Sequence, residues 1–199
     1  ITYENDTYDD YSYNKNLYYL NELNFQIADP TVIYVEEGEG AGYFYAYGTS
    51  DLIQCHGFQC WRSKDMTNWT KLPPEYVFQK DRYAGSPALY AFEDDPYYYV
   101  GYLEAYPHRG YANCIARSTD LVSWEYSPIN PVLMYNDFED KQIASAFLTP
   151  ADRQRIEEAL DINNSDMELC EYLGRTIIYY SWGDQLGHEF LAEACYEGG

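Results

Sequence analysis

The sequence predicts an all-β, propeller-like protein with about three four-stranded antiparallel blades and one inserted helix at residues 149–160. The phrase Arg-Ser-x-Asp-x-x-x-Trp occurs twice, at 62–69 and, 55 residues later, at 117–124. The same offset relates two aromatic strands, at 43–47 and 98–102. Because this unit of several short strands recurs at a fixed period, it is typical of propeller blades.

A third and weaker copy follows. Residues 176–182 have the composition of its aromatic strand and residues 189–194 that of the returning strand, but the Arg-Ser-x-Asp phrase is missing. The copies together predict a single propeller-like domain. Its expected extent is 25–199, with modules at 25–80, 83–133 and 163–199.

Each module opens with a short turn, which we call its opener, followed by a strand. The gap from the opener to the aromatic strand is 14, 12 and 14 residues in the three modules. This length fits one strand plus a hairpin loop. The three openers are Asp29-Pro30, Ser86-Pro87 and Asp166.

Two segments lie outside the modules. Residues 1–24 are Tyr-rich, and we expect them to be extended and to pack on the body or on a neighbouring molecule, with disorder of the first ten as the alternative. The helix at 149–160 is predicted by Thr149 as N-cap, Pro150 in the first turn and Asp152 three residues after the cap.

Composition restricts the function. The net charge of −21 opposes binding to nucleic acid or to anionic membranes, because both carry negative phosphates. No apolar run approaches the length of a membrane span. The 25 tyrosines favour half-buried strands, and some of their rings are suited to a sugar-binding cleft. We expect a secreted protein whose chain, starting at Ile1, is a processed form, with no cofactor and a structural Ca²⁺ as the minority interpretation.

The five cysteines leave at least one thiol unpaired. Cys55 and Cys60 flank a four-residue turn and could close a small hairpin disulfide. A zinc site at Cys55, His56 and Cys60 is the less favoured alternative, because no second ligand pair follows at finger spacing. Three sequons are potential glycan acceptors only in a protein secreted through an endoplasmic reticulum. They begin at Asn5, Asn68 and Asn163.

Residues 28–34, with Gly57-Phe58 and the phrase at 62–69, resemble the first blade of glycoside hydrolase family 43. That clan of five-bladed propellers includes arabinanase-, xylosidase- and invertase-like enzymes. Residues 163–194 resemble the last blade of bacterial members of the clan. The resemblance covers about 25–199 and implies a plant or algal polysaccharide as substrate.

The resemblance also implies carboxylate chemistry at the propeller axis. An inverting glycosidase needs a base to activate water and an acid to protonate the leaving oxygen, with about 6.5–9.5 Å between the two carboxyl groups. Asp29 matches the general base of the family, and Asp166 is the equivalent residue of the last module. The second module has Ser86 at this position, and Ser cannot act as the acid. Glu104 is a candidate replacement at the end of the aromatic strand.

Further residues at strand ends are candidates for substrate contact. Aromatic rings and polar tips in loops that follow aromatic strands are suited to bind sugar hydroxyls and ring faces. Among the loop histidines, which include His56 and His108, we expect His188 to be the one that reaches a ligand. The candidates are Tyr47, Asp51, Tyr102, Trp182 and His188.

Three modules are fewer than the five blades of the clan. The protein is therefore an open or rearranged propeller, a homo-oligomer or larger assembly whose chains complete one another, or a piece of a longer protein. Two functions remain open. One is a polysaccharide hydrolase, and the other is a catalytically inactive carbohydrate-binding or structural protein derived from the same fold.

Overall fold

The computed structural model describes residues 27–50, 56–74, 76–106, 110–135, 146–159, 162–184 and 187–196. Over these ranges the chain is almost entirely β, as predicted. The strands are β1 (Ile27–Val35), β2 (Tyr43–Ser50), β3 (Gly57–Phe58), β4 (Trp61–Ser63), β5 (Thr70–Lys71), β6 (Phe78–Gln79), β7 (Ala84–Ala91), β8 (Tyr98–Tyr106), β9 (Gly110–Ser118), β10 (Glu125–Tyr126), β11 (Asn163–Tyr172), β12 (Arg175–Gly183) and β13 (Glu189–Tyr196).

The predicted helix is α2 (Pro150–Glu158), the only one within the described ranges. Thr149 is its N-cap, and its hydroxyl accepts the backbone N–H of Asp152 at 3.2 Å. In return, the Asp152 carboxylate accepts the backbone N–H of Thr149 at 3.0 Å, which completes a capping box. No helix in the described part of the chain is long and apolar enough to span a membrane.

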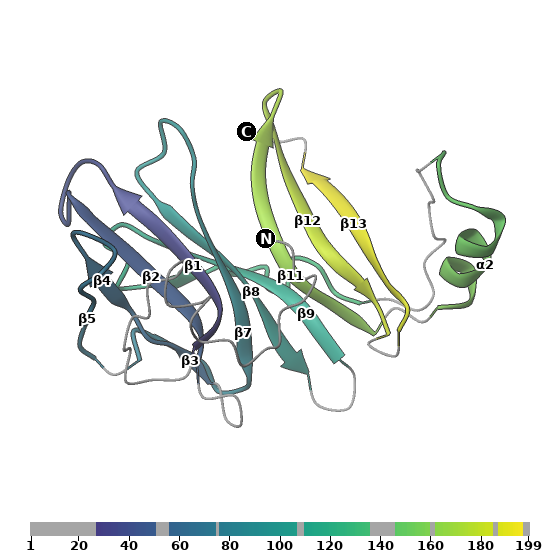
Figure 1. The fold of residues 1–199 in the computed structure, drawn as a ribbon, viewed down its shortest axis with the longest axis horizontal. Helices are drawn as coiled ribbons and strands as arrows, with labels where there is room; N and C mark the ends of the chain where they lie inside the picture. The colour runs from purple at the N-terminus through teal and green to yellow at the C-terminus, as the bar shows by residue number, and fades with distance from the viewer. Residues whose placement is uncertain are drawn as a thin grey trace, which may run out of the picture.

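The strands form three blades in chain order, from left to right in Figure 1. Blade I contains β1 to β6. Its strands are ordered β5-β4-β2-β3-β6, and β1 pairs with β2. Blade II contains β7 to β10 and blade III contains β11 to β13. Blades II and III are joined into one sheet by a single parallel pair, Asn163 with Tyr111. The innermost strands β1, β7 and β11 pack against one another in that order.

The repeated phrase forms the same turn in blades I and II. Oδ1 of Asp65 accepts the backbone N–H groups of Thr67 at 2.9 Å and Asn68 at 2.7 Å. Oδ1 of Asp120 accepts those of Val122 at 2.8 Å and Ser123 at 2.6 Å. Aspartate suits this position because its side chain is short and carries an acceptor oxygen that reaches the backbone N–H groups two and three residues ahead.

The main core lies between blades I and II and is largely aromatic. The rings of Phe58 and Phe78 stack with centroids 4.9 Å apart, and Tyr102 meets Phe78 edge-on at 4.7 Å. Trp124, the last residue of the second phrase, meets the Tyr47 ring edge-on at 5.9 Å. Blade III packs on blade II where Gly101 leaves room for Met167, because an added Cβ would lie only 2.8 Å from Met167 Cγ.

Both ends of the blade array expose apolar side chains. On β1 of blade I, Val32 and Tyr34 are 45% and 46% exposed. On blade III, Tyr179 of β12 and Leu191 of β13 are 36% and 78% exposed. A closed propeller buries such faces between neighbouring blades. The oligomer predicted from sequence remains a prediction.

Cys60 is a free, fully buried thiol, and burial raises its pKa to about 12. Its state contradicts the Cys55–Cys60 disulfide, although Cys55 itself lies outside the described residues. Within the described ranges, no group of three metal-ligating side chains is present. Of the sequons, Asn68 is exposed, Asn163 is buried at the start of β11 and Asn5 is outside the described ranges.

Candidate functional site

The three openers adopt the same unusual backbone. Asp29, Ser86 and Asp166 have φ values of 48°, 47° and 50°. Each lies where the pairing of its innermost strand shifts register. Such a bulge re-aims a side chain away from the regular alternation of the strand. A left-handed non-glycine residue costs roughly 1–3 kcal/mol and is concentrated at functional sites.

These bulges lie at one end of the blade array. The first residues of β1, β7 and β11 pair with residues at or near the ends of β2, β8 and β12. In Figure 1 the three innermost strands begin near the lower edge and run upward. The last residues of β2, β8 and β12 are therefore at the same end of the array as the three openers. We define this end of the array as the axial site.

Asp29 is exposed, and its carboxylate is held by a threonine of the paired strand β2 in the same blade. Oδ2 of Asp29 accepts the hydroxyl of Thr49 at 2.8 Å and lies 3.5 Å from the hydroxyl of Ser86. The Thr49 hydroxyl oxygen in turn accepts the backbone N–H of Ser86 at 2.8 Å. Thr49 is only 1% exposed. A buried hydroxyl thus links the opener of blade I to that of blade II and fixes the orientation of the Asp29 carboxylate.

Asp166 is also exposed and lines a polar pocket of about 360 Å³. Its Oδ2 accepts the hydroxyl of Ser165 at 2.8 Å. Two carboxylates, two hydroxyls and an amide line this pocket, a set of groups that can bind the hydroxyls of a sugar. The lining residues are Asn163, Ser165, Asp166, Ser181, Gly187 and Glu189.

The hairpin between β12 and β13 borders this pocket. Nδ1 of His188 lies 2.7 Å from Oδ2 of Asp184, and the backbone N–H of His188 donates to Oδ1 at 3.2 Å. The backbone N–H of Asp184 donates to the carbonyl of His188 at 3.1 Å. Guanidinium Nη2 of Arg155, in α2, donates to the carbonyl of Gly187 at 3.1 Å. The hairpin is therefore fixed from two sides.

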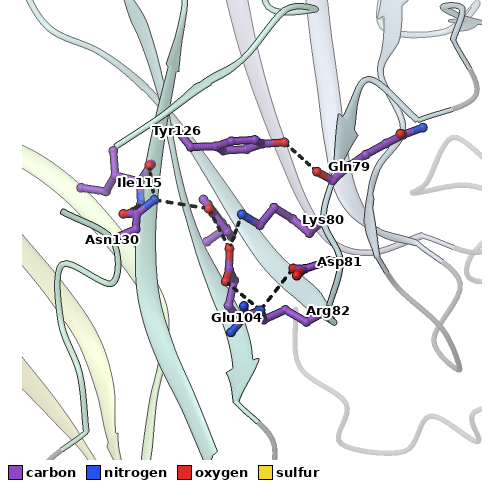
Figure 2. A network of polar contacts seen from close by, with 9 residues as sticks. Gln79, Lys80, Asp81, Arg82, Glu104, Ile115, Tyr126 and Asn130 are labelled. Carbon is purple, nitrogen blue, oxygen red and sulfur yellow. Dashed lines mark hydrogen bonds and ion pairs between the residues drawn. The ribbon is translucent and has the colours of Figure 1, made fainter. Parts of the chain in front are cut away.

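Glu104 lies in a buried network between blades I and II (Figure 2). It is 4% exposed, and its Oε1 accepts the hydroxyl of Tyr102 at 3.0 Å. Lys80 Nζ lies 2.7 Å from Oε1, and Arg82 Nε lies 3.5 Å from Oε2. Since these donors surround the carboxylate and almost none of it is exposed, its position argues against Glu104 as the replacement general acid.

The structure separates the other candidates. Tyr47 and Tyr102 are fully buried in the aromatic core, so the expectation that they contact substrate is not met. The Tyr47 hydroxyl donates to the carbonyl of Leu121. Trp182 is partly buried, with its ring tilted against Phe190 at 6.0 Å between centroids.

Asp51 and His108 lie outside the described residues. His56 is exposed and forms an isolated parallel bridge with Ala84. Sequence reasoning missed Thr49, Ser165 and Asp184. Two of these had a local signal, because Ser165 directly precedes Asp166 and Asp184 lies four residues before His188. Thr49 had none, since it reaches Asp29 across a strand pair.

No model of a known protein family matches this sequence, and no curated protein matches it. Its fold does recur among solved structures. An α-L-arabinofuranosidase from Lactobacillus brevis superposes with a TM-score of 0.56 and 15% identity, over 90% of this chain and 52% of that one. The chain has the fold of part of a propeller glycoside hydrolase.

Two further structures agree. A GH32 β-fructofuranosidase from Bombyx mori matches 84% of the chain and 32% of its own length, with a TM-score of 0.54 and 14% identity. An endo-1,4-β-xylanase from Bacteroides thetaiotaomicron matches 86% of the chain and 47% of its own length, with a TM-score of 0.50 and 20% identity. The chain thus spans about half, or less, of each of these structures, and what it shares with them is the fold. The resemblance to the five-bladed clan is confirmed at that level.

Proposed function

We propose that this chain carries the axial site of a secreted, inverting glycoside hydrolase that acts on a plant or algal polysaccharide. The observation that carries the proposal is the repeated left-handed bulge at Asp29, Ser86 and Asp166. Strained residues are concentrated at functional sites, and these three lie at equivalent positions of three blades, all at one end of the array.

Asp29 is the proposed general base. Its carboxylate is exposed to a ligand, and Thr49 occupies one side of Oδ2. The remaining acceptor positions can take a proton from a water molecule as that water attacks the anomeric carbon. Because Thr49 is buried and also bound to the backbone of Ser86, the carboxylate keeps one orientation between turnovers.

Asp166 is the proposed second carboxylate, in the polar pocket of blade III. Its hydrogen bond from Ser165 fixes one oxygen and leaves the other to bind sugar hydroxyls. In an inverting enzyme, base and acid must leave room for one sugar and one water. We therefore expect side-chain oxygens of Asp29 and Asp166 within about 10 Å of each other.

The alternative is a catalytically inactive carbohydrate-binding or structural protein. Two observations favour it: Ser86 stands at the middle bulge, and Glu104 is enclosed by Lys80 and Arg82. Under this alternative the polar pocket at Asp166 binds a saccharide without hydrolysis, and the exposed end faces mediate assembly.

The decisive experiment compares the wild type with Asp29→Asn on arabinan, xylan and fructan, with product configuration followed by NMR. We expect inverted products from the wild type and a loss of hydrolysis in the variant at an almost unchanged Tm, because an exposed base contributes little to packing. Asp94→Asn is the matched control, since Asp94 is also exposed and left-handed, with φ 62°, but lies at the opposite end of blade II. Saccharide binding without hydrolysis by the wild type would establish the alternative.

A further inference from the structure

At the axial site, as far as the structure describes it, one histidine is held by a carboxylate. Both oxygens of Asp184 are used by His188, one by the ring at 2.7 Å and one by the backbone N–H at 3.2 Å. The Asp184 side chain is 9% exposed, whereas that of His188 is 41% exposed. A buried acceptor thus holds an accessible imidazole.

This contact determines which ring nitrogen can act on a ligand. A carboxylate only accepts hydrogen bonds, so the nitrogen that faces Asp184, Nδ1, carries the proton. Nε2 is then the nitrogen left to exchange a proton with a ligand. A carboxylate that fixes the tautomer and orientation of an imidazole is the arrangement by which proton-transferring histidines are held in enzymes.

The His188 side chain is partly exposed beside the pocket of Asp166, although His188 is not itself one of the residues that line that pocket. His188 lies between Gly187 and Glu189, and both neighbours line the pocket that contains Asp166. Its hairpin follows β12, so it is at the end of the array where the three openers lie. Ser86 at the middle bulge cannot act as the acid, and Glu104 is buried. Two carboxylates line the pocket, Asp166 and Glu189. Because Asp166 is assigned to bind sugar hydroxyls, Glu189 is the competing donor.

We infer that His188 is the proton donor of the axial site and that Asp184 is its positioning residue; this inference rests on the proposed hydrolase function. Protonated His188 gives its Nε2 proton to the glycosidic oxygen as the bond from that oxygen to the anomeric carbon breaks. The bonding electron pair stays with the oxygen. Water attacks the anomeric carbon and loses a proton to Asp29, and exchange with solvent returns both groups to their starting states.

The test uses the dependence of acid catalysis on the leaving group. The sugar released from a polysaccharide is a poor alkoxide leaving group and needs the proton. The 4-nitrophenolate released from a 4-nitrophenyl glycoside of the same sugar is a good leaving group and departs without it. We expect His188→Gln to lower kcat on the polysaccharide by about 10²- to 10⁴-fold, which is the usual contribution of a general acid. On the aryl glycoside, the same variant should change kcat only a few-fold. Asp29→Asn should lose activity on both substrates.

Glu189→Gln is the matched comparison, because Glu189 lines the same pocket and is the adjacent residue. If Glu189→Gln, and not His188→Gln, shows the leaving-group dependence, the inference is overturned. It is also overturned if the wild type hydrolyses polysaccharide and His188→Gln is as active. If the wild type hydrolyses neither substrate, the proposed function fails and the inference fails with it.

A second readout does not depend on activity. Long-range ¹H–¹⁵N correlation spectra of the neutral His188 ring should show the proton on Nδ1 in the wild type. Asp184→Asn should shift the ring toward the Nε2–H form, because an amide can also donate. A neutral wild-type ring with its proton mainly on Nε2 would overturn the inference.

Discussion

Nζ of Lys80 lies 2.7 Å from Oε1 of Glu104, and this ion pair joins the first blade to the second. Lys80 directly follows β6 of blade I, and Glu104 is in β8 of blade II. The two side chains are 16% and 5% exposed. The same ammonium lies 4.1 Å from the centroid of the Tyr126 ring, and Figure 2 shows both blades contributing to the network. The pair therefore fixes one relative placement of the two blades.

Lys80→Met should destabilise the protein. Removing one partner leaves the Glu104 carboxylate buried, which costs about 3–5 kcal/mol in such pairs. Because Arg82 is still 3.5 Å from the other oxygen, we expect the lower end, about 3 kcal/mol. Urea unfolding measures the change.

Lys64→Met is the control for this substitution. Lys64 is an exposed lysine that also lies over a ring, 4.9 Å from the centroid of Tyr43. Its loss should cost at most about 1 kcal/mol. The double variant Lys80→Met/Glu104→Leu should recover much of the stability, since it removes both members of the buried pair and Arg82 still lies 3.3 Å from Oδ1 of Asp81. Equal losses in the two lysine variants would contradict a structural role for the pair.

The turn at Asp120 should make stability depend on pH in the acid range. Burial raises the pKa of Asp120, but the hydrogen bonds from Ser123, Val122 and Ser118 outweigh burial and lower it below the ordinary value. A carboxyl with a lowered folded-state pKa stabilises the fold above its unfolded pKa, about 3.9, and this contribution disappears as pH falls through the folded-state pKa.

Asp120→Ala should therefore reduce stability by about 1–2 kcal/mol at pH 7, comparable to the loss of a capping side chain. Its deficit should shrink as pH falls through the lowered folded-state pKa of Asp120, because the wild-type carboxyl then becomes protonated. Thermal unfolding of both proteins from pH 2 to pH 7 measures the difference. A deficit that does not change with pH would show that the charge of Asp120 is irrelevant to the turn.

Thr49→Val should impair hydrolysis through Asp29. Valine has nearly the shape of threonine but cannot donate to Oδ2 of Asp29 or accept the N–H of Ser86. A hydrogen bond to a charged group contributes about 1.5–3 kcal/mol, so kcat should fall roughly 10- to 100-fold. Thr49→Ser keeps the hydroxyl and should retain most activity. Loss of activity in both variants would point to packing rather than to the hydroxyl.

The exposed end faces predict association in solution. Val32 and Tyr34 at one end, and Tyr179 and Leu191 at the other, are the apolar side chains that a further blade or a second copy would cover. We expect an oligomer, or a face covered by residues 1–24, in light scattering after size exclusion. Because each chain has a charge of −21, added salt should strengthen association. A monodisperse monomer with residues 1–24 disordered would contradict this prediction.

The sequence by itself determined the features that depend on neighbouring residues. The phrase that recurs at Asp65 and Asp120 forms the same turn twice because each aspartate bonds backbone groups two and three residues ahead, which depends on neighbouring residues alone. The capping box at Thr149 and Asp152 is equally local. The recurrence of the phrase at 62–69 and 117–124, with its aromatic strands, also revealed the blades and the equivalence of their openers.

Only the tertiary structure decided which side chains face a ligand. Strand alternation indicates that neighbouring residues point to opposite faces, but which face is covered depends on the blade that packs against it. For this reason Tyr47, Tyr102 and Glu104 lie in the interior, although their positions at strand ends suggested contact with substrate. Thr49 reaches Asp29 from the opposing strand, 20 residues away in sequence. Such contacts follow from pairing register and blade packing, which no local pattern specifies.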